Sequence, residues 1–232
     1  MRGWKQLAIA GIGVAISVLA ILSILNQVGA DQLLNAFRTA RYEYVLMSLV
    51  VIVLGLLARG VRWRVLLNDE LSTGRSFFIM NIGYMVNGLL PLRLGEVGRA
   101  YLASRASPNI TTMGALSTIV IERMLDLVAV LVILGFAVIS APVPEFVRIA
   151  AIGFTPTVII GFLAVILISR MHDQVIAVSD RLFEKIPLAK RLHLDRFVRQ
   201  FLDGLAPFTK TQAKILWLTL LWTVISWGFS LL

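Results

Sequence analysis

The segment from Asn87 to Arg99 gathers residue types that can bind a charged phosphate group. It reads Asn-Gly-Leu-Leu-Pro-Leu-Arg-Leu-Gly-Glu-Val-Gly-Arg, so Arg93, Glu96 and Arg99 are spaced three residues apart. Arginine suits phosphate because its planar guanidinium can donate to two oxygens at once. We therefore treat this segment as the first candidate site.

A second charged cluster, Glu122-Arg123 followed by Asp126, lies at the start of a long apolar run. On a helix, Glu122 and Asp126 share one face because they are four residues apart. Charges inside apolar segments are costly and are usually paired or line a polar path. We predict that these three residues neutralise one another in part, or pair with Arg93 and Arg99.

Three interpretations of the two clusters stay open. They can form a site for a lipid phosphate or another polar substrate, a purely structural set of ion pairs, or a site with a catalytic carboxylate. We favour binding over catalysis, because no second acid, nucleophile or metal set accompanies the carboxylates. Asn87 can supply an uncharged donor or acceptor, and Gly95 and Gly98 would let the backbone approach a headgroup closely.

The composition predicts an all-α, multi-pass membrane protein. The 232 residues are 58% hydrophobic and only 15% charged, and the mean hydropathy is +0.86. The net charge of +9 is explained by Lys and Arg in cytoplasmic segments, so we predict no nucleic-acid partner. The chain has no Cys and two His without ligand-like spacing, so we predict no disulfide, no metal site and no cofactor.

The apolar runs predict a single integral membrane domain, a helical bundle with its N-terminus in the cytoplasm. Arg2 and Lys5 precede the first run and set this orientation. An amphipathic helix on the outer surface follows at residues 31–44. The predicted spans are residues 7–25, 45–64, 113–141, 149–169 and 215–232, with a kink at Pro156.

Residues 77–90 form a shorter apolar run, interrupted by Asn and Gly and followed by Pro91. Such a length suits a re-entrant segment better than a full span. We predict a helix that dips into the membrane, breaks at residues 87–91 and returns, so that residues 77–99 form one broken unit. A complete short span is the alternative, and it would reverse the sidedness of the segments that follow.

Residues 172–213 form the longest polar segment, which is basic and cytoplasmic in this topology. Its apolar residues from Leu194 to Leu205 follow helical spacing and predict an amphipathic helix. That helix either lies on the inner leaflet or packs against the bundle. For Arg59, Arg62 and Arg64, orientation of the span and headgroup contact suffice as an explanation.

Together these residues resemble a known family. Residues 56–67 (LLARGVRWRVLL), 87–102 (NGLLPLRLGEVGRAYL) and 121–126 (IERMLD) occur in the order and spacing of the transmembrane region of lysylphosphatidylglycerol synthase/flippase proteins and their stand-alone relatives. The resemblance covers most of the chain. The positions that match the family pattern are Asn87, Pro91, Arg93, Gly95, Glu96, Arg99, Glu122, Arg123 and Asp126.

The resemblance implies an integral protein of the cytoplasmic membrane that moves lipid across the bilayer. The implied partners are anionic, aminoacylated phospholipids or isoprenoid-linked lipids, with a lipid-modifying enzyme or a second copy as further partners. No aminoacyl-transferase domain is present, so lipid synthesis is not implied. The family usually continues with a second Pro/Gly-rich broken segment, so we expect the chain to be truncated at its C-terminus. The alternative function is a non-transporting scaffold for a lipid-modifying or glycosyl-transferring enzyme.

Overall fold

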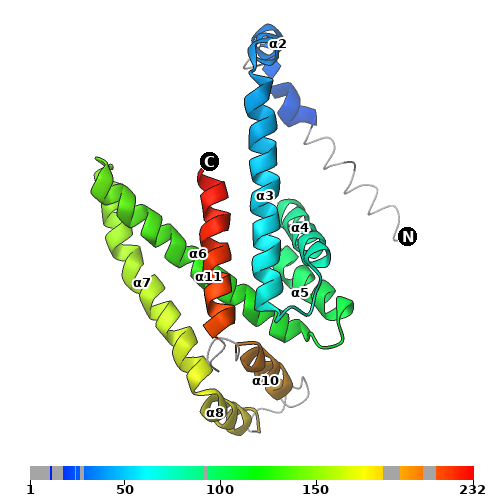
Figure 1. Ribbon diagram of the computed structural model, residues 1–232, viewed down its shortest axis with the longest axis vertical. Coiled ribbons are helices and arrows are strands. Elements are labelled where there is room, and N and C mark those ends of the chain that lie inside the picture. The colour runs from blue at the N-terminus through cyan, green and yellow to red at the C-terminus, as the bar shows by residue number, and fades with distance from the viewer. Residues whose placement is uncertain are drawn as a thin grey trace. The chain divides into compact units, whose positions relative to one another are not determined.

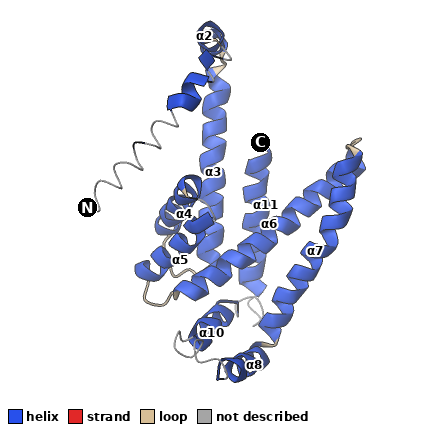
Figure 2. Cartoon of the chain, turned by 180° about the vertical axis from the view of Figure 1, so that it is seen from behind, coloured by secondary structure: helices blue, strands red, loops and turns tan. Residues whose placement is uncertain are grey.

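The computed structural model describes residues 11, 18–23, 25–26, 29–90, 93–184, 194–205 and 213–232, and every regular element in these ranges is a helix (Figure 2). The all-α prediction is therefore confirmed. Most of the first predicted span, residues 7–25, lies outside the described residues. The chain divides into two compact units, Met1–Leu49 and Val50–Leu232.

The first unit contains an amphipathic helix that is shorter than the one predicted for residues 31–44, because residues 42–44 already belong to the next helix. Helix α2 (Ala30–Thr39) ends at Ala40, whose extended backbone separates it from the next helix. The hydroxyl of Tyr42 donates to the carbonyl of Phe37 at 2.7 Å and closes this turn. Arg41 pairs with Glu43 at 3.0 Å, and both side chains are exposed.

Helix α3 (Tyr42–Leu66) begins in the first unit and continues into the second. It is one of three described helices that are long and apolar enough to cross a membrane, together with α7 (Glu145–Arg170) and α11 (Ala213–Leu231). Only 6% of the most apolar 18-residue stretch of α7 is buried in the protein. Helices that are so apolar and yet so exposed in the protein are suited to contact with lipid.

Helices α4 (Thr73–Leu89) and α5 (Leu94–Ala106) pack against each other within the second unit (Figure 1). The helix is interrupted between Leu89 and Leu94, where the Pro- and Gly-containing sequence predicts a break. At 17 residues, α4 is about 26 Å long, which is less than the roughly 30 Å of a hydrocarbon core. This length is suited to a re-entrant hairpin.

Helix α6 (Thr112–Ser140) covers the residues for which a span is predicted, 113–141, within one residue at each end. Thr111 caps its N-terminus by accepting from the backbone N–H of Gly114 at 3.0 Å. Extended residues around Pro142 and Pro144 follow, and α7 then begins at Glu145 with Pro156 inside it. Figure 1 shows α6 and α7 meeting at this loop and diverging toward their other ends.

The polar segment 172–213 contains α8 (His172–Glu184) and α10 (Leu194–Leu205). Helix α10 packs against α6, and its Leu202 and Leu205 are buried. Gly204 makes this contact close, since a Cβ there would lie 2.0 Å from the hydroxyl of Ser117. Helix α10 therefore packs against the bundle, which is one of the two alternatives predicted for it.

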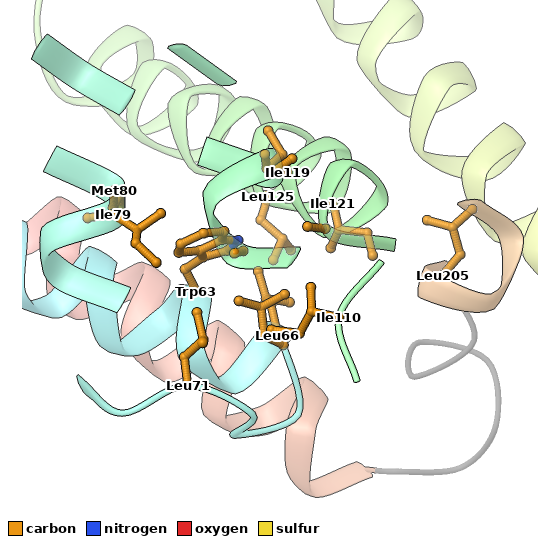
Figure 3. Close-up of a cluster of buried hydrophobic side chains, with 14 of the residues drawn as sticks. Trp63, Leu66, Leu71, Ile79, Met80, Ile110, Ile119, Ile121, Leu125 and Leu205 are labelled. Atoms are coloured by element: carbon orange, nitrogen blue, oxygen red, sulfur yellow. The ribbon is translucent and has the colours of Figure 1, made fainter. Parts of the chain in front are cut away.

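The hydrophobic core of the second unit lies around the C-terminal part of α3 and the N-terminal half of α6 (Figure 3). Trp63 and Leu66 of α3 contact this core from one side, and Ile119 and Leu125 of α6 belong to the same cluster. Helices α4, α5 and α10 add further buried residues. The core therefore surrounds the part of α6 that carries the charged cluster.

Candidate functional site

Glu122 is the centre of a buried network of arginines and carboxylates. Its Oε1 lies 2.9 Å from Nη2 of Arg62 on α3, and its Oε2 lies 2.6 Å from Nη2 of Arg99 on α5. All three side chains are at most 2% exposed. One carboxylate thus joins three helices by accepting charge-assisted hydrogen bonds from two guanidinium groups.

Arg62 extends the network along α6 and toward α11. Its Nη1 is 2.7 Å from Oδ1 of Asp126, which lies one helical turn after Glu122. The same Nη1 donates to the hydroxyl of Thr223 on α11 at 3.4 Å. The indole N–H of Trp227 donates to Asp126 at 3.3 Å, so two side chains of α11 contact the network.

Arg99 is further held by an aromatic ring. Its guanidinium carbon lies 4.4 Å from the ring centroid of Trp63. The indole N–H of Trp63 in turn donates to the hydroxyl of Thr118 on α6 at 3.2 Å. A cation over the face of a tryptophan is stabilised by the ring quadrupole, so Arg99 is enclosed by protein groups.

Arg123 closes the network at its more exposed edge. Its Nε is 3.1 Å from Glu96 on α5, and its Nη1 is 3.4 Å from Asp126. The network therefore contains equal numbers of opposite charges, three arginines and three carboxylates: Arg62, Arg99, Arg123, Glu96, Glu122 and Asp126. Buried charges are tolerated when charges of opposite sign are paired with them in this way.

Three donors of this network are buried and make no hydrogen bond to a described residue, the Nε atoms of Arg62, Arg99 and Arg123. The Nε of Arg123 still lies 3.1 Å from Glu96, whereas the other two arginines pair with the described carboxylates through their Nη atoms. Each buried N–H that lacks an acceptor costs free energy. Water or a polar ligand that reached the network would find donors there.

The α4–α5 packing depends on Asn87 and Gly95. The side-chain oxygen of Asn87 accepts from the backbone N–H of Gly95 at 2.7 Å. A Cβ on Gly95 would lie 2.0 Å from the carbonyl oxygen of Gly83. Gly95 therefore permits close packing of two helices, whereas a Cβ on Gly98 would meet no atom within 4 Å and would face open space.

Arg93 is placed differently from the other arginines of the predicted site. It is the N-cap residue of α5 in the left-handed conformation, with φ of 53°. Its side chain is exposed, and no ion pair or hydrogen bond to it occurs within the described ranges. The structure thus does not bring Arg93 to Glu122 or Asp126, although it does bring Arg99 there. Pro91 lies outside the described residues.

Sequence reasoning missed Arg62, which we assigned to orientation and headgroup contact. Charge balance is the signal that could have found Arg62. Two carboxylates on one face of an apolar helix require cations, and Arg62 is a cation within another apolar helix, α3. No group of three His, Asp or Glu side chains in the described part of the chain is arranged to hold a metal ion.

Comparison with known families matches residues 10–232 to the lysylphosphatidylglycerol synthase transmembrane region. The chain belongs to this family. As a member of the lysylphosphatidylglycerol synthase transmembrane-region family it is a multi-pass helical membrane protein, and the resemblance stated from residues 56–126 is confirmed.

Curated relatives of this family member include two UPF0104 membrane proteins of Methanothermobacter thermautotrophicus, 24% and 23% identical over 92% and 88% of the chain. A UPF0104 membrane protein of Pyrococcus horikoshii is 22% identical over 94% of it. The chain spans 65%, 62% and 70% of the lengths of these three proteins, in the same order. No solved structure matches the chain significantly.

Proposed function

We propose that the protein takes part in translocating an anionic lipid across the cytoplasmic membrane, in the manner of a flippase. The observation that carries the proposal is an exposed cation, Arg93, next in sequence to a helix whose Glu96 and Arg99 belong to a buried, charge-balanced network. The family description names a synthase of lysylphosphatidylglycerol, a phospholipid with an anionic phosphate. Aminoacylated and isoprenoid-linked lipids are the substrate classes we propose.

Arg93 is the residue we assign to the headgroup phosphate. Its charge is not compensated by any described side chain, and it stands at the N-terminus of α5, where the helix dipole also favours an anion. Arg99 is less suited to this role, because Glu122 and Trp63 already occupy its guanidinium. Of the two arginines that the sequence predicts as phosphate ligands, we therefore assign only Arg93 to the phosphate.

The buried network supports movement rather than simple adhesion to the membrane. Six ionised groups on α3, α5 and α6 form a polar region beside the hydrophobic core of a membrane protein. A headgroup crossing the bilayer needs such a region, because hydrocarbon cannot solvate its charges. In this proposal Glu96, Glu122 and Asp126 orient the arginines or contact a cationic part of the headgroup.

The proposed orientation has the N-terminus in the cytoplasm and the basic segment 172–213 on the inner leaflet side. Lys and Arg gather there, which agrees with the positive-inside rule. Membrane lipids are the proposed partners. A lipid-modifying enzyme or a second copy of the chain is a further proposed partner in the whole protein.

The test measures accessibility of a fluorescently labelled phosphatidylglycerol headgroup in proteoliposomes. We expect the wild-type chain to move the label between leaflets and the Arg93→Gln variant to lose most of this movement. Arg75→Gln is the matched control, because Arg75 is also exposed and lies at the start of α4, away from the break. Asp126→Asn tests the network itself and is expected to slow movement.

Equal rates for Arg93→Gln and Arg75→Gln would show that Arg93 does not bind the phosphate. Absence of movement by a folded wild-type protein, at equal reconstitution, would reject transport by this chain. Copurification of a lipid-modifying or glycosyl-transferring enzyme in that case would favour the scaffold function.

A further inference from the structure

Helices α6 and α7 enclose an apolar crevice that the Arg–carboxylate network does not use. Two adjoining cavities of ≈430 and ≈310 Å³ lie between them and share Phe162 as a wall. On α6 the crevice is lined by residues such as Met124, Val128 and Leu131, whereas Glu122 and Asp126 pair with α3 and α5. It therefore lies on a different face of α6 from the network.

The smaller cavity is apolar except at one end. Ile121, Leu125 and Leu205 form buried parts of its wall. Its polar lining residues are Ser169 and Arg170, at the C-terminus of α7. The cavity thus has a hydrocarbon body and a single cationic end.

Arg170 is available to a ligand. Its side chain is exposed and has no ion pair or hydrogen bond to any side chain in the described ranges. Two carboxylates of the neighbouring helices, Asp173 and Asp203, both contact His172, at 3.0 and 3.1 Å. A guanidinium with no anionic partner beside an apolar cavity is complementary to the phosphate of a lipid.

We propose that the α6–α7 crevice binds one acyl chain of an anionic phospholipid, with the phosphate held by Arg170. An acyl chain needs no hydrogen bonds, and the crevice offers few. The hydroxyl of Thr155 already donates to the carbonyl of Ala151 at 2.7 Å, and that of Ser169 to Leu205 at 3.3 Å. An extended peptide segment would leave its backbone groups unsatisfied there.

This binding does not rest on the proposed transport. It concerns a different face of α6 and requires only that the protein holds the lipid. A protein that fails to move lipid can still bind it at Arg170, and a transporting protein can lack this site. A measurement of lipid binding without transport therefore tests this site.

Native mass spectrometry of the detergent-solubilised chain would measure bound dioleoyl phosphatidylglycerol against dioleoyl phosphatidylcholine. We expect the wild type to retain one phosphatidylglycerol in preference to phosphatidylcholine. Arg170→Gln should weaken phosphatidylglycerol binding about tenfold, because a charge-assisted contact is lost. Arg181→Gln is the matched control, since Arg181 is an exposed arginine of α8 outside both cavities.

A second pair of variants tests the cavity independently of charge. Val165 lines the smaller cavity, so Val165→Trp should fill it and remove bound lipid. Leu167 is 57% exposed and lines neither cavity, so Leu167→Trp should bind like the wild type. Circular dichroism and thermal unfolding of each variant establish that the protein is folded.

Equal binding by Arg170→Gln and Arg181→Gln overturns the proposal, as does undiminished binding by a folded Val165→Trp variant. Equal retention of phosphatidylcholine and phosphatidylglycerol by the wild type also overturns it. A photoreactive residue at Leu163, which lines the larger cavity, should cross-link to lipid. Cross-linking to a second copy of the chain, without a lipid adduct, would contradict the assigned occupant.

Discussion

Glu122 and Arg99, twenty-three residues apart in the chain, are joined by a contact of 2.6 Å between Oε2 and Nη2. Glu122 is fully buried and Arg99 is 2% exposed. The opposite oxygen of the same carboxylate binds Arg62. Two buried cations thus share one anion, and this anion joins α3 and α5 to α6.

Replacement of Glu122 by Gln should strongly destabilise the protein. It leaves Arg62 and Arg99 buried without the carboxylate that they share. Removal of one partner from a buried ion pair costs about 3–5 kcal/mol, and we expect a loss of this size in the free energy of unfolding in detergent micelles. Glu145→Gln is the control, because the side chain of Glu145 is 77% exposed and its pairing with Arg148 spans 3.8 Å. Similar stability of the two variants would contradict the structural role of Glu122.

Replacement of Gly95 by Ala should separate α4 from α5. The new Cβ would lie 2.0 Å from the carbonyl oxygen of Gly83 and 2.6 Å from the side-chain oxygen of Asn87. Overpacking of this kind costs about 1–3 kcal/mol or more, and thermal unfolding in detergent should show it as a lower Tm. Gly98→Ala on the same helix meets no atom within 4 Å and should leave the Tm unchanged or slightly raised. A lower Tm for Gly98→Ala than for Gly95→Ala would disprove the close packing of α4 and α5.

Replacement of Gly204 by Ala should detach α10 from α6. A Cβ there would lie 2.0 Å from the hydroxyl of Ser117 and 2.7 Å from the backbone of Gly114. Because backbone cannot move aside cheaply, we expect a loss of about 1–3 kcal/mol and faster proteolysis within α10. Gly153→Ala, on α7 with nothing within 4 Å, is the matched variant. Unchanged proteolysis of Gly204→Ala would argue against docking of α10 on α6.

The contact between α8 and α10 should weaken as the pH rises. Hydrogen bonding to Asp173, and then to Asp203, raises the pKa of His172 above its usual 6.5. Because the folded-state pKa is raised, this stabilisation is fully present below pH 6.5 and is lost as the pH rises through the folded value. We expect the Tm of the wild type to fall between pH 6 and pH 8.5 by more than that of His172→Gln. Parallel pH profiles for the two proteins would contradict this role.

Much of the fold could be predicted from local sequence. The bounds of α6 were expected within one residue, because a long uncharged run ends at Pro142 and Pro144. The interruption between α4 and α5 was expected from Pro91, because a proline disfavours helical backbone at the residue before it. Asn87 and Gly88, which also entered that expectation, lie inside α4. These features depend on the chain within a few residues and therefore need no knowledge of the packing.

The candidate site was predictable only in part. The sequence supplied its carboxylates and several of its arginines, because charge in an apolar run is conspicuous. It did not show that Arg62 would join Glu122, since those residues are sixty positions apart. Nor did it separate Arg99, which packs into the network, from Arg93, which stays exposed.

The sequence alone determined that this chain forms membrane helices and showed where one of them breaks. It also determined that charged groups lie among these helices. Hydrophobic length, prolines and glycines act locally and suffice for those conclusions. Which arginine meets which carboxylate was decided by the tertiary structure. That choice depends on how closely the helices approach, as at Gly95 against Gly83, and on how the left-handed turn at Arg93 directs the start of α5.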